Sequence, residues 1–296
     1  MTDFPKDFRA VRTKLSPEAF AISEGMDVAP TDLIPEETWN SIVHLPDDVS
    51  LRTSDHYGTE LEVLWDLWGD WVTVVLELQG PNQGLAETPM ASVAGDTASY
   101  FQAAVQNALV GYYRLAFASL RGVVENMTVG LHFELTADRP KFQSWLAGDE
   151  FGFGSAADQL RQQPAVAQLE QSLQAAVGDD LLRQRNTPAR ADGGLVREVF
   201  KELSKYAHGG PNYTDADLWA SNGPVFVPEV FEEWLQMFAL VFAIGLLEIR
   251  IGRPNLAAGR EDRRELRELF GTAVSILVPD SDGRRILEAA AAFLWQ

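Results

Sequence analysis

Cysteine is absent from the 296 residues of this chain. Its absence excludes disulfide bonds, zinc sites with thiolate ligands, iron–sulfur clusters held by cysteine, and a cysteine nucleophile. A chain without cysteine is also compatible with a reducing compartment inside the cell. Covalent chemistry and metal binding that depend on cysteine are therefore excluded for this chain.

Histidine is scarce, and the four histidines His44, His56, His132 and His208 show no ligand pattern. No two of them have the spacing of zinc ligands. None stands three residues after a glutamate, which excludes the Glu-x-x-His pairs of di-iron carboxylate bundles. The Gly-x-Ser-x-Gly elbow and the glycine-rich fingerprints of nucleotide sites are missing as well. We therefore expect neither a metal nor a cofactor.

Positive charge is in deficit, because 43 acidic residues face 24 basic ones and the net charge is −19. Such a field repels the phosphate backbone, so the surface as a whole is not expected to bind nucleic acid nonspecifically. A local basic patch is still compatible with this charge. The segment Arg183–Arg190 is the one compact basic candidate.

Long hydrophobic runs are also missing. The most apolar stretch, Leu235–Leu247, is flanked by Glu232, Glu233 and Glu248. It is shorter than the roughly 20 residues that a membrane-spanning helix needs, so it predicts a buried core helix. The first residues, Met1–Asp7, do not combine a basic start with an apolar run and so do not resemble a secretory signal. We expect a soluble, cytoplasmic protein without a membrane contact.

Helical periodicity dominates what is present. Apolar residues recur every three or four positions from about Ser54 to Leu78, and the same spacing assigns Trp65, Trp68 and Trp71 to core packing rather than to a ligand site. Thr88-Pro89 has the pattern of a helix start, with threonine as N-cap. From there the helical pattern continues to Leu135, as two helices that meet near Gly111.

The remaining chain repeats this pattern, and no alternating strand is found. Further helices are predicted around Phe142, over 155–177 with a break at Pro164, over Gly194–His208, from Pro228 to about Ile251, and over about 261–277 and 282–295. The fold class is therefore all-α, a multi-helix bundle with an irregular N-terminal arm. We expect residues 1–53 to form an arm that wraps the main domain, and residues 54–296 to form a single helical domain with its core at about 95–250.

The end of the helix Gly194–His208 carries the best-defined titratable group. Gly209-Gly210-Pro211 stops the helix, so His208 lies against the negative end of the helix dipole, which favours its charged form. Lys201 and Ser204 precede it on the same helix. On the predicted helix that begins near Gly111, Arg121 and Glu125 are four residues apart and share a face.

Two interpretations of this group stay open. In the structural one, His208 caps the last carbonyl groups, Ser204 bonds back within its turn, and Arg121 pairs with Glu125. In the functional one, His208 is a general acid or base while Arg121 or Lys201 holds an anion.

The pairing of Leu120-Arg121-Gly-Val-Val-Glu125 with Leu203-Ser204-Lys-Tyr-Ala-His208-Gly209 resembles all-helical bacterial proteins related to the HEPN superfamily, over roughly residues 95 to 250. The resemblance implies a helical, often dimeric protein, and many HEPN proteins are metal-independent ribonucleases of toxin–antitoxin and phage-defence systems. Their motif is an arginine, four to six further residues and a histidine. His208 matches the histidine, whereas Lys201 stands where an arginine is expected, and lysine lacks the bidentate fork that arginine offers to phosphate.

Two functions from different classes follow. The first is a HEPN-like, metal-independent endoribonuclease or toxin-like effector in bacterial stress or phage defence, acting on RNA as a homodimer, with His208, Arg121, Lys201, Glu125 and Ser204 as its site. The second is a noncatalytic helical scaffold or partner-binding subunit, in which the same residues only hold two helices together. The two predict opposite results for His208→Ala: loss of cleavage in the first, and loss of stability alone in the second.

Overall fold

A computed structural model describes residues 35–79, 88–177, 181–182, 194–207 and 224–254, together with residues 271, 273, 276, 277 and 288. All regular structure in these ranges is helical, which confirms the all-α fold class. The chain divides into two compact units, residues 1–45 and residues 46–296. In the first unit the described residues form α2 (Glu36–Trp39) and the π-helix η3 (Asn40–His44).

The second unit is a bundle of α-helices. They are α3 (Leu45–Gln79, which begins at the boundary), α4 (Pro89–Leu109), α5 (Tyr113–Thr136), α6 (Arg139–Leu146), α7 (Phe153–Leu160), α8 (Pro164–Val177), α9 (Gly194–Ala207) and α11 (Pro228–Gly252). The predicted breaks near Gly111 and at Pro164 are confirmed by the ends of these helices. The predicted helices at about 261–277 and 282–295 lie largely outside the described residues, as do residues 1–34 of the predicted arm.

Helical structure extends further toward the N-terminus than the sequence predicts. Residues 36–53 were expected to be irregular apart from one short helix, yet α2, η3 and the first turns of α3 occupy them. The expected start at Ser54 is wrong because α3 begins at Leu45. A local break explains the error: Tyr57 has non-helical torsion angles (φ −126°, ψ 31°), so the helical periodicity is interrupted at that point.

The turn between α4 and α5 depends on Gly111. At the start of α4 the Ala91 amide donates to the Thr88 side chain, so the predicted N-cap is present. Gly111 has φ +79°, and a β-carbon there would lie 2.2 Å from the carbonyl oxygen of Val225. Only glycine allows both the left-handed torsion angle and this close backbone approach.

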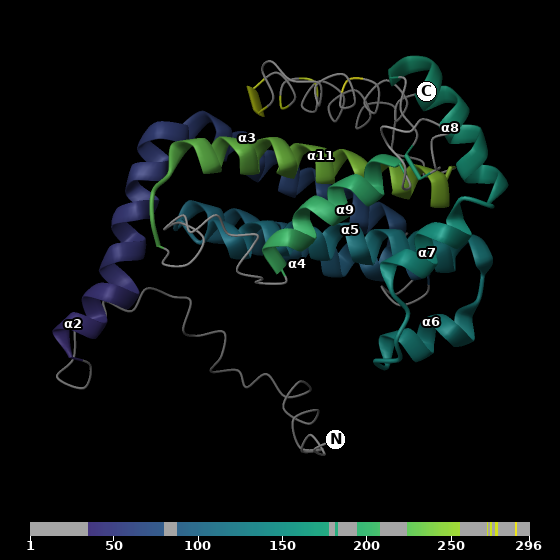
Figure 1. Cartoon of the computed structure of the whole chain (residues 1–296), viewed down its shortest axis with the longest axis horizontal. Helices are drawn as coiled ribbons and strands as arrows, with labels where there is room; N and C mark the ends of the chain where they lie inside the picture. Colours follow the sequence, from purple (N-terminus) through teal and green to yellow (C-terminus); the bar gives the residue numbers. More distant parts are fainter. Residues whose placement is uncertain are drawn as a thin grey trace. The chain divides into compact units, whose positions relative to one another are not determined.

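Helix α5 is the central element of the second unit. It packs against α4, α7, α9 and α11 (Figure 1), and α11 in turn also contacts α4 and α8. Because α5 has neighbours on several sides, its residues from Val123 to Phe133 are buried almost without interruption. A helix with neighbours on several sides is the centre of this bundle.

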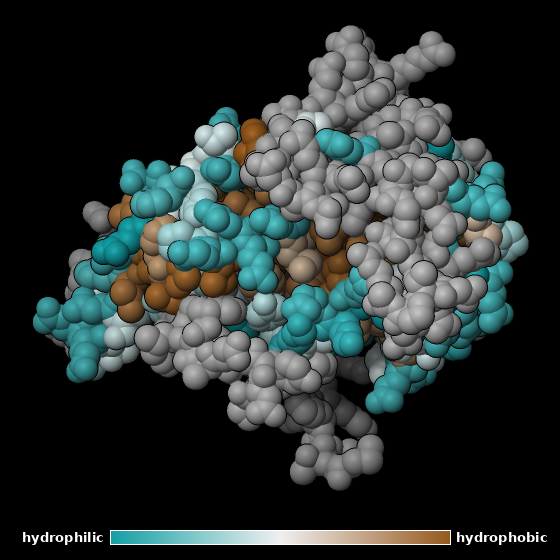
Figure 2. Space-filling model, turned by 45° about the horizontal axis from the view of Figure 1, so that its top comes forward, coloured by the Kyte–Doolittle hydropathy of each residue, from teal (hydrophilic) through white to brown (hydrophobic). Residues whose placement is uncertain are grey.

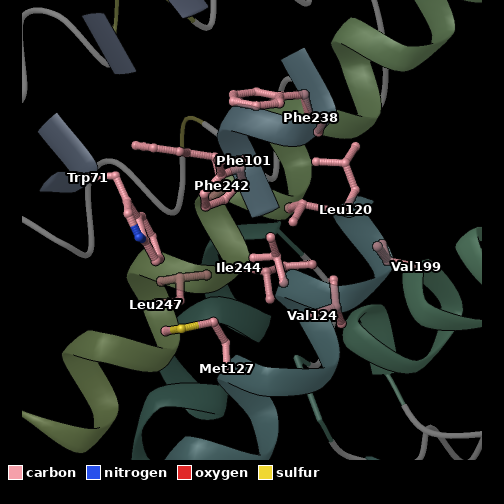
Figure 3. Close-up of a cluster of buried hydrophobic side chains, with 14 of the residues drawn as sticks. Trp71, Phe101, Leu120, Val124, Met127, Val199, Phe238, Phe242, Ile244 and Leu247 are labelled. Atoms are coloured by element: carbon pink, nitrogen blue, oxygen red, sulfur yellow. The ribbon is translucent and has the colours of Figure 1, made fainter. Parts of the chain in front are cut away.

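The core is aromatic where α3, α4 and α11 meet. Trp71 lies with its ring 5.0 Å from that of Phe101 and 5.6 Å from that of Phe242 (Figure 3). Gly245 allows this packing, because a β-carbon there would lie 2.7 Å from the Trp71 ring. The Trp71 indole N–H donates to the Ala94 carbonyl, so the buried ring leaves no donor unpaired.

The predicted core helix is α11, the most apolar helix described. By length and composition it could cross a membrane, but 67% of its most apolar window is buried within the protein. A core helix of a soluble protein passes the same test, and the buried residues of α11 belong to the common hydrophobic core.

The prediction that three tryptophans pack in the core is only partly correct. Trp71 is fully buried and Trp68 is half-buried, but Trp65 is 61% exposed.

Figure 2 shows one face of the molecule, on which hydrophobic residues (brown) reach the surface beside hydrophilic ones (teal).

Candidate functional site

The candidate site lies where α9 crosses α5. Val196, Val199 and Leu203 recur at three- and four-residue spacing on α9 and are buried, so this face anchors the helix. Near the end of α9 the ring of Tyr206 stacks on that of Phe117, with centroids 4.3 Å apart. These contacts fix the register in which the polar residues of the two helices meet.

Arg121 is the centre of the polar contacts. Its Nη1 lies 3.2 Å from Glu125 Oε2, and its Nε donates to Ser204 Oγ at 3.1 Å. Its guanidinium carbon lies 4.7 Å from the centre of the Phe200 ring, which is a cation–π distance. The guanidinium is therefore held by an ion pair, a hydrogen bond and an aromatic face at once.

The residues that hold Arg121 are themselves fixed. Ser204 Oγ donates to the Phe200 carbonyl at 2.6 Å, one turn back along α9. The Phe200 ring stacks on Phe153 of α7 at 3.8 Å, with an angle of 11° between the ring planes. Half-buried Arg121 and Glu125, with side chains 22% and 32% exposed, thus close the edge of a packed aromatic stack.

A second arginine of α5 makes a similar contact. Arg114 Nε donates to the Tyr206 carbonyl at 2.9 Å, in the last turn of α9. The last carbonyl groups of a helix have no partner within the helix, so this bond caps the end of α9 from outside. Both arginines therefore link α5 to α9.

The structure brings together three of the five predicted site residues, Arg121, Glu125 and Ser204. Lys201 is exposed on α9 and takes no part in this contact. His208 lies outside the described residues, directly after the last described residue of α9. Lys205 pairs with Glu202 on its own helix rather than with α5.

Among the described residues of this crossing, Tyr206 is the one group with a strongly changed acidity. Burial, together with the neighbouring carboxylates of Glu233 and Glu202, raises the pKa of its phenol to about 12. The phenol therefore stays protonated at neutral pH and cannot act as a base.

Sequence reasoning missed a buried carboxyl in the core, Glu248. Its side chain is fully buried, Thr128 Oγ1 of α5 donates to its Oε1 at 2.8 Å, and its Oε2 has no partner in the part of the chain that the structure describes. Burial raises the pKa of this carboxyl to about 8. Its position in the sequence could have indicated this burial, because Glu248 continues the three- and four-residue spacing of Val241, Ile244 and Gly245 on the buried stripe of α11.

Sequence reasoning also gave no role to His132, which is buried near the end of α5. Its ring stacks on Phe151 at 4.9 Å, and Lys141 Nζ lies 4.5 Å from the centre of the Phe151 ring. Its Nδ1 has no partner among the described residues. Burial lowers the pKa of His132, and the nearby positive charge of Lys141 lowers it further, whereas Asp138 opposes the shift.

Chemically, the α5–α9 crossing can hold two helices in one register, and Arg121 already contacts Glu125, Ser204 and Phe200 of its own chain. An incoming anion would meet the carboxylate of Glu125 beside the guanidinium. The chain matches no protein-family model, no curated protein and no solved structure.

Proposed function

We propose that this chain is a noncatalytic helical protein that acts by binding a protein partner. The observation that carries the proposal is the state of Arg121. In the predicted ribonuclease Arg121 or Lys201 holds the scissile phosphate, and Arg121 is already engaged by Glu125, Ser204 and the Phe200 ring. These contacts support a structural role in joining α5 to α9.

Charge points in the same direction. A surface that binds RNA carries a basic patch, and with a net charge of −19 the one compact basic candidate is Arg183–Arg190, which lies outside the described residues. Glu125, the ion-pair partner of Arg121, adds a negative charge at the place where a phosphate would have to bind. A carboxylate next to the guanidinium lowers its attraction for a second anion.

The HEPN-like ribonuclease stays a prediction, and an RNA-cleavage assay separates the two functions. We expect the folded protein to leave single-stranded RNA intact both with and without EDTA. We also expect Arg121→Ala to lower the free energy of unfolding by about 1–3 kcal/mol, because it removes an ion pair, a hydrogen bond and a cation–π contact.

The matched control is Arg52→Ala, which removes an exposed arginine of α3. It should change the free energy of unfolding by no more than about 0.5 kcal/mol. Metal-independent cleavage that is abolished by Arg121→Ala and by His208→Ala, with stability unchanged in both, would overturn the proposal in favour of the ribonuclease.

The homodimer also stays a prediction, taken from the resemblance to HEPN proteins. Sedimentation equilibrium gives the molar mass directly and compares it with the 32.7 kDa of one chain. A mass twice that value would support the dimer, and a mass equal to it at micromolar concentration would exclude a stable one.

A further inference from the structure

One helix face of the second unit presents large hydrophobic side chains to solvent. The α3 outer face consists of Gly58, Glu62, Trp65, Gly69 and Leu76, which follow one another at three- or four-residue spacing, with a step of two turns at the end. Trp65 and Leu76 are 61% and 60% exposed. Their separation of eleven residues is about three helical turns, so both lie on the same line along α3.

This face is rigidly supported from below. The ring of Trp65 lies 4.9 Å from that of Trp68, whose indole N–H donates to the Ala98 carbonyl of α4 at 3.1 Å. One turn further on, Trp71 donates to Ala94 of the same helix. Because Trp65 rests on an anchored ring, it loses little conformational freedom when a partner covers it.

Gly69 leaves a gap between the two exposed side chains. A β-carbon at Gly69 or at Gly58 would meet no atom within 4 Å. Glycine inside a helix costs about 1 kcal/mol relative to alanine, and neither torsion angles nor crowding require it at these positions. The space over Gly69 can receive one apolar side chain of a partner, with Trp65 on one side and Leu76 on the other.

Charge restricts what this partner can be. Residues 53–79 contain six acidic residues, Asp55, Glu60, Glu62, Asp66, Asp70 and Glu77, and no lysine or arginine. Glu62 and Asp66 are exposed beside Trp65. Nucleic acid and anionic membranes are repelled by such a border, and so is the same face of a second copy.

We propose that the α3 outer face binds a basic amphipathic helix of another protein. Apolar residues of that helix, at positions i, i+4 and i+11, contact Trp65, fill the gap over Gly69 and reach Leu76. Its lysine and arginine residues flank this stripe and pair with Glu62 and Asp66. The inference rests on the proposed function, since it names the class of partner that such a protein would bind.

The test uses the full chain and a fluorescein-labelled synthetic peptide, with leucine at every third or fourth position and lysine at the others. Fluorescence anisotropy measures binding. We expect Trp65→Ala to weaken it by about tenfold or more, as aromatic anchors at interfaces do. Gly69→Trp fills the gap and should weaken it comparably without disturbing the fold, because the site is open.

Three controls accompany these variants. Leu115→Ala removes a comparably exposed leucine of α5 and should leave the affinity unchanged. A peptide with glutamate in place of lysine should not bind, and added salt should weaken the binding of the lysine peptide. Circular dichroism verifies that each variant is folded.

The inference is overturned if Trp65→Ala and Gly69→Trp bind the peptide like the unaltered chain. It is also overturned if either variant dissociates a homodimer in sedimentation velocity, or abolishes binding to phosphatidylserine vesicles, because the face would then serve a second copy or a membrane. Failure of the proposed function is recognised separately, since RNA cleavage by a chain that still binds the peptide at this face contradicts the proposed function alone.

Discussion

Glu248 offers the sharpest physical prediction. Its carboxyl is fully buried, it accepts one hydrogen bond, from Thr128, and burial raises its pKa from 4.5 to about 8. The folded protein therefore holds this carboxyl in its protonated, neutral form at neutral pH. We consider the substitution Glu248→Gln, which keeps the shape and the acceptor for Thr128 but has no proton to lose.

The sign of the pH dependence follows from proton uptake. The unfolded chain loses the proton near pH 4.5, whereas the folded chain keeps it up to about pH 8. Between these values folding takes up a proton, so the free energy of unfolding falls as the pH rises, by at most about 1.4 kcal/mol per pH unit. Below this window the carboxyl is protonated in both states, and above it the penalty is constant.

Glu248→Gln removes this slope. At pH 7 the penalty is on the order of 3 kcal/mol, and the buried, unpaired amide of the glutamine offsets about 1–3 kcal/mol of the gain. We therefore expect a variant that equals or exceeds the unaltered chain in stability at pH 7 and falls below it near pH 4.5. The difference between the two is the informative quantity, because all other groups titrate alike in both.

Urea unfolding at pH 5, 6, 7 and 8 measures this difference. It should change in favour of Glu248→Gln by roughly 1 kcal/mol per pH unit. Glu150→Gln, at an exposed position, is the matched control and should give a difference that does not depend on pH. A difference that is flat for Glu248→Gln as well, or that changes in the opposite direction, would refute the argument from burial.

Two further predictions concern single residues of the core. Gly111→Ala should lower the free energy of unfolding by more than about 2 kcal/mol, because Gly111 has φ +79° and a β-carbon there would lie 2.2 Å from the Val225 oxygen. The control Gly154→Ala, where a β-carbon meets nothing within 4 Å, should be neutral or stabilise by up to about 1 kcal/mol. Equal urea midpoints for the two variants would contradict this prediction. For His132, burial and Lys141 lower the pKa of the folded state below 6.5, so stability should fall as the pH drops through this value while the unfolded chain takes up the proton. His132→Leu should abolish that part of the slope in urea unfolding between about pH 5 and pH 7, and an unchanged slope would contradict a buried neutral imidazole.

Helix positions were predictable because breaks and caps are local. Thr88 caps the start of α4, because its side chain accepts a hydrogen bond from the Ala91 amide three residues further on. Gly111 forms the turn between α4 and α5 with a torsion angle that glycine alone adopts readily. The break at Tyr57 is different, because it lies directly before Gly58 and also involves a contact that is distant in sequence: the Tyr57 hydroxyl donates to Glu232 of α11 at 3.0 Å. The start of α3 was therefore predicted too late.

Burial was harder to predict than helicity. Trp65 and Trp68 share the three-residue spacing of a core stripe, but only Trp68 meets α4, through the Ala98 carbonyl. Which side of α3 is covered depends on where α4 and α11 lie, and the period of one helix does not contain that information. For the same reason Glu248 could be seen on the apolar stripe of α11 but not recognised as fully buried.

The group of Arg121, Glu125 and Ser204 could be named from the sequence. Arg121 and Glu125 lie one turn apart, and Ser204 lies near a helix end that the sequence marks clearly. What the group does depends on Phe200 of α9. Its ring both receives the guanidinium and stacks on Phe153 of α7. This aromatic contact spans three helices that are distant in sequence, so no local pattern contains it.

The central claim is that Arg121 holds α5 and α9 together, and a double-mutant cycle tests it most directly. The free energy of unfolding is measured for the unaltered chain, Arg121→Ala, Ser204→Ala and the double variant. We predict a coupling energy of about 0.5–1.5 kcal/mol between the two positions, as expected for residues in direct contact. Additive effects, with no coupling beyond the error of the measurement, would contradict the account.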